Sequence, residues 1–197
     1  MSLSLVTGIT EEPVTLDDQK VHLRLDTADD DAYVQSCITA ARQWVEGQTH
    51  RALMAQTWDY NIDYGWPHRV GLHRIDYPIN PVKVQASPIV DSITYVDSDG
   101  ASQTLAADQY TIVARTNSSY IVPAFDVSWP TVRHVPNAIT VRFVAGYVTV
   151  PQELHRAIML LAALLYEKRE PIVTSTIVAK LPFSVEALIS PFRTMTF

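Results

Sequence analysis

An unbroken apolar run covers residues 157–166, AIMLLAALLY, inside a segment that predicts a helix over residues 151–170. Pro151 is tolerated in a first helical turn, Glu153 suits the positive helix end, and Pro171 stops the helix. Every position of the run is apolar, so no rotation of a 3.6-residue repeat leaves a polar face for water. We therefore expect this helix to be covered on all sides.

A membrane does not provide that cover. The ten apolar residues span about 15 Å as a helix, whereas the hydrocarbon core of a bilayer is about 30 Å thick. We expect the helix to lie in the core of a folded domain and to receive part of its cover from another subunit.

Two helices are predicted near the N-terminus. Residues 14–25 have Thr15 as a candidate N-cap with Asp18 three residues on. Residues 29–47 begin with three aspartates, Asp29, Asp30 and Asp31, which favour a helix start and are a weaker candidate for a divalent-cation site. Apolar residues then repeat at three and four positions: Tyr33, Cys37, Ile38, Ala41, Trp44 and Val45. Their face is the expected partner of the 151–170 helix.

From residue 55 the period changes to two. Four apolar residues, Trp58, Tyr60, Ile62 and Tyr64, alternate with polar ones, as in a half-buried strand. Further strand-like runs cover residues 69–75, 82–85, 89–96, 102–105, 110–114, 119–122 and 138–144. Residues 97–100, DSDG, predict a hairpin loop in which glycine supplies a positive φ. Short strands at this spacing predict a small antiparallel sandwich or barrel.

The predicted fold is therefore α+β, with a β domain inserted at residues 55–147. Residues 1–54 and 148–197 would form a helical core of two N-terminal helices, the long C-terminal helix and an apolar tail. In that tail, residues 172–178 are β-branched, and Ser184 would cap a short helix over 185–189 that Pro191 ends.

The apolar tail predicts contact with a neighbouring subunit, because exposed apolar patches of this size usually mark interaction sites. The candidate interface residues from the long helix and the tail are Leu161, Leu165, Ile177, Val178, Leu181, Phe183, Leu188 and Phe192.

Composition limits the classes of function. The net charge of −6 gives the chain no overall basic surface for binding DNA phosphates. Its single cysteine, Cys37, permits neither an intramolecular disulfide nor a thiolate metal cluster within one chain. The N-terminal residues do not have the pattern of a secretory signal, so we expect synthesis in the cytoplasm.

Candidate catalytic residues are sparse. His68 and His73, with Asp63 or Asp76, are the one set that suggests a metal-dependent hydrolase. Their pattern matches no known metal-binding motif, which favours surface and loop residues over metal ligands. The glycines form no phosphate-binding loop, and Cys37 falls on an apolar helix face. We expect no catalytic site, no metal and no cofactor.

Aromatic residues leave one binding alternative. A carbohydrate-binding β module would use Trp58, Trp66 or Trp129 as a platform for a sugar ring. Alternation places Trp58 on the same face as Tyr60 and Ile62, which favours a place in the core over a binding surface.

Several segments together resemble the head-tail connector (adaptor) proteins of tailed bacteriophages and prophages. In order along the chain, they are PVTLDDQKVHLRLD, RALMAQTWDY, SITYVDSDGASQTL with DQY, AITVRFVAGY, VPQELHRAIMLLAALLYEKRE and LPFSVEALISPFR. The resemblance extends over nearly the whole chain and is to the longer members, which carry a β insert between the connector helices.

This resemblance implies a structural protein of the virion neck, with no enzymatic activity. Such proteins assemble in the host cytoplasm into a ring of about a dozen subunits at the head-tail junction. The ring lies below the portal protein, extends the DNA channel and receives the tail or a stopper protein. The implied partners are thus other copies, the portal, the tail or stopper, and duplex DNA that passes without sequence-specific binding, with no membrane.

Overall fold

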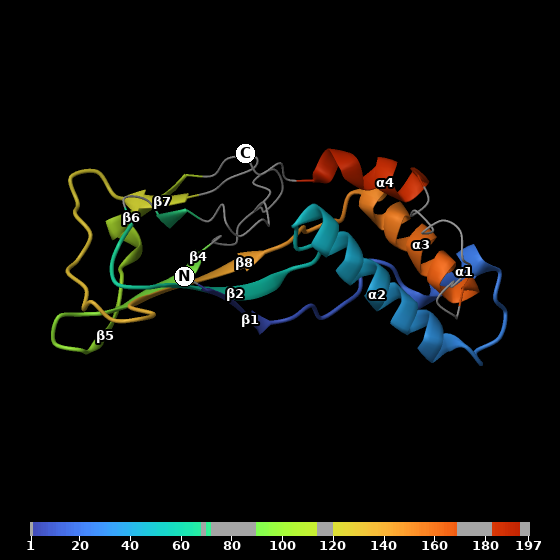
Figure 1. Cartoon of the computed structure of the whole chain (residues 1–197), viewed down its shortest axis with the longest axis horizontal. Coiled ribbons are helices and arrows are strands. Elements are labelled where there is room, and N and C mark those ends of the chain that lie inside the picture. The colour runs from blue at the N-terminus through green and yellow to red at the C-terminus, as the bar shows by residue number, and fades with distance from the viewer. Residues whose placement is uncertain (1, 68–69, 72–89, 114–119, 169–182, 194–197) are drawn as a thin grey trace, which may run out of the picture. The chain divides into compact units, whose positions relative to one another are not determined.

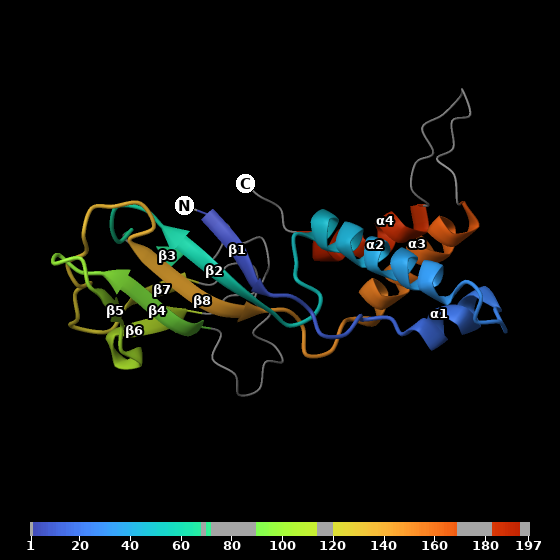
Figure 2. The same cartoon turned by 90° about the horizontal axis from the view of Figure 1, so that it is seen from below.

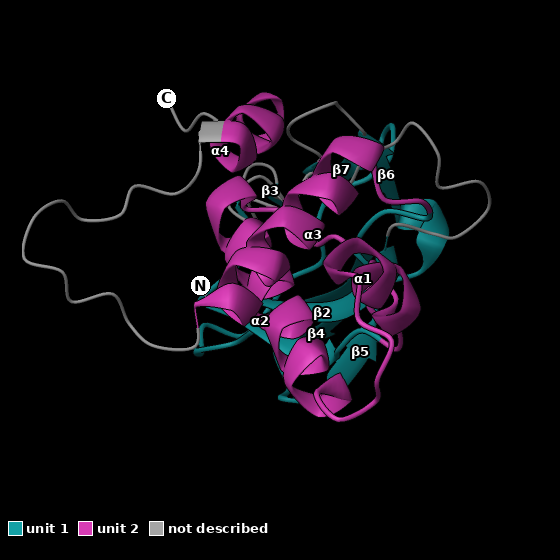
Figure 3. Cartoon of the chain, turned by 90° about the vertical axis from the view of Figure 1, so that its right-hand side faces the viewer, with its two compact units in different colours: residues 1–9, 54–148 teal, residues 10–53, 149–197 magenta. Residues whose placement is uncertain are grey.

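The computed structural model describes residues 2–67, 70–71, 90–113, 120–168 and 183–193 (Figure 1). It divides into two compact units, coloured separately in Figure 3. Residues 1–9 and 54–148 form a β unit, and residues 10–53 and 149–197 form a helical unit. The fold class is thus α+β, as the sequence predicts.

A five-stranded antiparallel sheet is the centre of the β unit (Figure 2). Its order is β1-β2-β8-β4-β5. The strands are β1 (Ser2–Thr7), β2 (Gln56–Ile62), β4 (Val90–Val96), β5 (Ser102–Thr104) and β8 (Ile139–Ala145). Side chains alternate between the two sides of this sheet, so one side is apolar and the other polar. Tyr60, Val141 and Phe143 are buried on the apolar side. On the other side, the Arg142 guanidinium donates two hydrogen bonds of 2.7 Å to the Asp59 carboxylate.

A second antiparallel sheet has the order β3-β7-β6. It consists of β3 (Val70–Gly71), β6 (Tyr110–Val113) and β7 (Tyr120–Pro123), with the short 3-10 helix η1 (Ala107–Gln109) before β6. The strands expected near 89–96, 102–105, 110–114, 119–122 and 138–144 are confirmed. The run at 82–85 and most of the run at 69–75 lie outside the described residues, and closure into a sandwich or barrel stays a prediction.

The predicted hairpin loop between β4 and β5 is also confirmed. Asp97 Oδ1 accepts hydrogen bonds from the backbone N–H groups of Asp99 and Ala101, at 3.0 and 2.9 Å. Gly100 has φ +91°, a value that suits glycine far better than other residues.

Two features of the β unit differ from the prediction. Residues 2–7, which the sequence analysis assigned to the helical core, form strand β1 and pair with β2. Tyr64 was expected in the core face of the strand, but the strand ends at Ile62. Tyr64 has φ +65° and is 53% exposed, because the backbone turns there and takes its side chain off the buried face.

The helical unit contains α1 (Leu16–Leu23), α2 (Asp31–Thr49), α3 (Gln152–Glu167), α4 (Phe183–Ile189) and the 3-10 turn η2 (Ser190–Phe192). Thr15 caps α1, because its hydroxyl accepts the backbone N–H of Asp18 at 3.1 Å. Helix α3 packs against α2 and α4. Ile38 and Val45 from α2 and Ile158 from α3 are among the fully buried residues.

A buried polar network holds the two ends of residues 10–53 together. Arg42 Nε donates to Glu12 at 2.7 Å, and Arg42 Nη1 donates to Glu46 at 2.6 Å. Glu46 also accepts the backbone N–H of Leu53 at 3.0 Å, and Glu12 accepts the Thr39 hydroxyl at 2.8 Å.

No helix among the described residues has the length and apolarity needed to cross a bilayer.

Candidate subunit interface

The predicted interface residues of α3 have different environments. Leu161 is 6% exposed and contributes to the core of its own unit. Leu165 is half-buried, and its backbone carbonyl accepts the Tyr33 hydroxyl at 3.3 Å. Leu165 therefore has side-chain surface left for a partner, whereas Leu161 has almost none.

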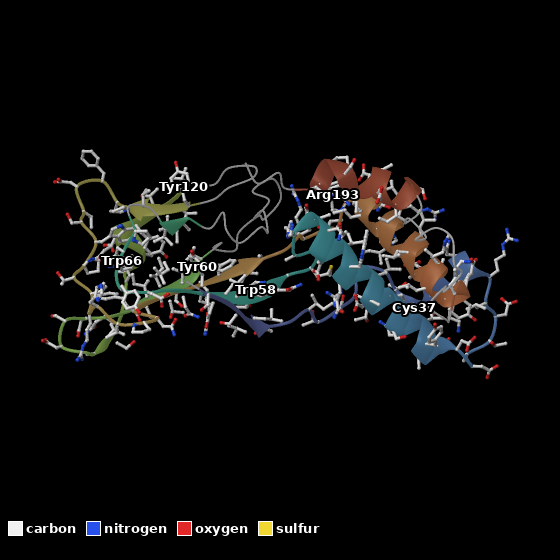
Figure 4. The ribbon with its side chains drawn as sticks, in the orientation of Figure 1. Cys37, Trp58, Tyr60, Trp66, Tyr120 and Arg193 are labelled. Atoms are coloured by element: carbon white, nitrogen blue, oxygen red, sulfur yellow. The ribbon has the colours of Figure 1, made fainter. Side chains whose placement is uncertain are left out.

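The predicted tail residues are described only in part. Leu188 in α4 and Phe192 in η2 are both half-buried. The Phe192 carbonyl accepts a hydrogen bond from Arg51 Nε at 2.6 Å, and Arg193 Nη2 donates to Gln48 at 3.2 Å (Figure 4). Phe183 begins α4, but its side chain lies outside the described residues, as do Ile177, Val178 and Leu181.

The described residues of the chain bury only one side of helix α3, and cover of the other side by another subunit stays a prediction. Its buried positions form one stripe: Leu154, Ala157, Ile158, Leu161 and Ala162. The remaining apolar positions are half-buried: Met159, Leu160, Ala163, Leu164, Leu165 and Tyr166. Leu160 and Ala163 lie on the side of the helix opposite the buried stripe, because successive residues are about 100° apart. This partly exposed apolar side of α3 is a candidate contact surface, and Leu160 is absent from the residues selected by sequence.

Other apolar side chains are exposed on the β unit. Phe125, between β7 and β8, is 99% exposed, and Leu5 and Val6 of β1 are 51% and 45% exposed. Backbone hydrogen bonds hold the Phe125 turn, from Ala124 N–H to Gln109 and from Val127 N–H to Ala124. Sequence periodicity does not identify these residues, since their exposure depends on strand order and on a turn.

The described residues contain no group of three or more His, Cys, Asp or Glu side chains placed to hold a metal ion. His68 and His73 lie outside the described residues. Cys37 on α2 is buried (Figure 4).

Two aspartates at the acidic start of α2 have partners on other helices. Asp30 accepts a hydrogen bond from the Tyr166 hydroxyl at 2.6 Å, and Asp31 forms an ion pair with Lys20 at 2.7 Å. These contacts join the start of α2 to α3 and α1.

The aromatic platform suggested by the sequence has a different arrangement. Trp66 stacks on Trp129 with ring centroids 4.3 Å apart and an interplanar angle of 5°. Trp66 Nε1 also donates to the Pro130 carbonyl at 2.9 Å. Each indole therefore covers one face of the other, which leaves less ring surface for a sugar. Trp58 is half-buried on β2.

Comparison with known proteins identifies the fold. The family model described as "Phage gp6-like head-tail connector protein" matches residues 13–90. A chain from the neck of an empty gene transfer agent (GTA) particle, computed with C6 symmetry, is similar over 100% of this chain and 97% of its own, at 28% identity and a TM-score of 0.74. The resemblance to phage head-tail connectors is confirmed.

Two further solved structures are similar to this chain over 100% of its length and 97% of theirs. One is a chain of the virion of a native GTA particle, at 27% identity and a TM-score of 0.73. The other is from the neck of a native GTA particle computed with C12 symmetry, at 26% identity and a TM-score of 0.70. No curated protein sequence matches this chain. These similarities support a structural connector role in the neck of a phage-like particle.

Proposed function

We propose that this chain forms a closed ring at the head-tail junction of a tailed phage, a prophage or a related particle. The ring would lie below the portal protein, extend the DNA channel and provide the attachment site for the tail or a stopper protein. The observation that carries this proposal is the similarity, over the whole chain, to proteins in necks computed with sixfold and twelvefold symmetry. A ring of about a dozen copies is consistent with that symmetry.

The apolar side of α3 supports a ring of repeated contacts. Rings use heterologous interfaces, in which one surface of a subunit meets a different surface of the next. Leu160, Ala163 and Leu164 would supply one surface, and Leu188 and Phe192 of the C-terminal segment the other. Burial of a half-exposed leucine contributes about 1 kcal/mol at 25 cal/mol per Å², so several such contacts are needed in each interface.

Charge supports a channel that does not retain DNA. Each copy carries a net charge of −6, so a ring has no overall attraction for phosphates. Duplex DNA would pass through without sequence-specific binding, because strong phosphate contacts would hold it in place. The proposed role is mechanical: it requires no catalysis, metal or cofactor. Assembly would take place in the host cytoplasm.

Mass photometry of the purified chain at several concentrations, alone and with portal protein, tests the proposal. We expect a discrete species of six or twelve copies, or of a close number, that increases with concentration or with portal. A chain that stays monomeric in both conditions would contradict it.

A carbohydrate-binding module is the alternative, and tryptophan fluorescence separates the two functions. The stacked Trp66 and Trp129 rings predict no change in emission on addition of oligosaccharides. A saturable shift in emission would favour carbohydrate binding instead.

A further inference from the structure

Strand β1 is an open edge of the five-stranded sheet. It pairs with β2 on one side, and no other strand in the described part of the chain pairs with its second side. Soluble proteins usually protect such edges with charged residues, prolines, bulges or a covering segment. The sequence of β1, SLSLVT, contains no ionisable side chain and no proline, and its one irregularity is the shift between Leu5 and Thr7.

Strand β1 carries exposed apolar side chains at the edge of the apolar side of the sheet. Leu3 lies opposite Tyr60 and Leu5 opposite Trp58, so both leucines are on the side of the sheet that carries the core. Leu5 is half-exposed, and so is Val6 at the irregularity. Ser2 and Ser4 lie opposite Asn61 and Asp59, on the polar side. An added strand would therefore extend both the backbone ladder and the apolar side of the sheet.

We propose that an edge strand of a second copy of this chain pairs with β1. This inference rests on the proposed ring, and it names one contact within it. A second copy is the expected occupant, because similar chains lie in necks computed with sixfold and twelvefold symmetry, where copies surround one axis. The neutral edge also suits contact between copies, each of which carries a net charge of −6 and repels the others elsewhere.

Strand β6 is the expected counterpart on the second copy. A β1 to β1 contact would be isologous and would close a two-fold dimer, whereas a ring needs two different edges. Strand β6 is an edge of the three-stranded sheet, and its sequence, YTIV, is uncharged and β-branched. Strand β5 is a poorer match, because it has three exposed residues and Asp97 holds its Gln103 side chain at 2.9 Å.

The double variant Leu5→Lys/Val6→Lys tests this contact by placing two charges on the edge. Both side chains are exposed in the isolated chain, so we expect a folded protein with the circular dichroism spectrum of the wild type. We expect its assembly to require at least a tenfold higher concentration in mass photometry. Val21→Lys is the matched control, because Val21 on α1 is 79% exposed, and it should assemble as the wild type does.

Cysteine cross-linking provides a second test that does not depend on the lysine variant folding. In a Cys37→Ala background, Ser4→Cys/Thr111→Cys should form disulfide-linked multimers, and Ser4→Cys alone should not form dimers. Dimers from Ser4→Cys alone would overturn the pairing of β1 with β6, because they require β1 beside β1. Wild-type assembly by the lysine variant would overturn the β1 contact while leaving the ring intact. A wild-type chain that never assembles would instead contradict the ring, and the β1 contact with it.

Discussion

Gly146 lies directly against the peptide group that joins Met54 to Ala55. A Cβ atom on Gly146 would overlap the Met54 carbonyl, and Gly146 has φ +134°, which other residues rarely adopt. The contact occurs where the last residue of β8, Ala145, pairs with the first residue of β2, Gln56. Glycine at this position therefore allows the chain to leave β8 while the start of β2 stays paired.

Gly146→Ala should destabilise the β unit by about 3 kcal/mol or more, because it adds backbone strain to a clash with main-chain atoms. The midpoint of thermal or urea unfolding measures the change. Gly47→Ala is the control, since nothing lies within 4 Å of a Cβ at this position in α2. It should stabilise the chain by about 0.5–1 kcal/mol through helix propensity. Equal effects of the two substitutions would refute this account of Gly146.

Arg42→Met should destabilise the helical unit by about 3–5 kcal/mol, because the buried carboxylates of Glu12 and Glu46 would lose the guanidinium that pairs with both. The side chains of Arg42, Glu12 and Glu46 are 9%, 15% and 11% exposed. Arg142→Met is the comparison, since Arg142 is 42% and Asp59 16% exposed, so this bidentate pair is partly in water and its loss should cost less than the loss of Arg42. Adding Glu12→Gln and Glu46→Gln to Arg42→Met should restore part of the stability.

Asp97 should make the β4–β5 hairpin sensitive to acid. The Gln103 amide, with the N–H groups of Ala101, Asp99 and Gly100, holds the pKa of the Asp97 carboxyl below its ordinary value. The folded state therefore binds a proton less readily than the unfolded state. The stabilisation is present above the ordinary carboxyl pKa of about 4 and is lost as pH falls through the lowered value.

Nuclear magnetic resonance titration of Asp97 measures that pKa directly. In Asp97→Asn the hairpin should lose its acid sensitivity, because the amide keeps an acceptor oxygen and does not titrate in this range. An Asp97 pKa at or above its ordinary value would contradict the role assigned to these hydrogen bonds.

Leu161→Asp and Leu160→Asp should have different effects although the residues are adjacent. Leu161 is buried in its own unit, so an unpaired charge there should unfold the helical unit at room temperature. Leu160 is half-buried on the opposite side of α3, so its replacement should leave the subunit folded and impair assembly. Circular dichroism and mass photometry measure the two effects, and equal unfolding by both variants would remove the α3 surface from the interface.

Local patterns were enough to predict most of the elements. The Thr15 cap, the two-residue alternation of β2 and the DSDG loop depend on neighbours in sequence, and each forms as expected. The alternation Ser2, Leu3, Ser4, Leu5 was also present, but the strand it forms was missed, because β1 has its partner 50 residues or more away. Periodicity alone does not name such a partner.

The candidate interface was harder to predict from sequence. The apolar run of α3 indicates that the helix needs cover but not which side its own chain provides. Which side of α3 is buried depends on how α2 and α4 pack against it. Leu161 faces this packing and is buried, whereas Leu160 is half-buried. The full exposure of Phe125 likewise depends on a turn held by Gln109.

Electron microscopy of the purified chain, alone and with portal protein, tests the ring most directly. We expect annular particles with sixfold or twelvefold rotational symmetry, or a symmetry close to these, around a hole wide enough for duplex DNA. Only monomers or two-fold dimers in both samples would contradict it.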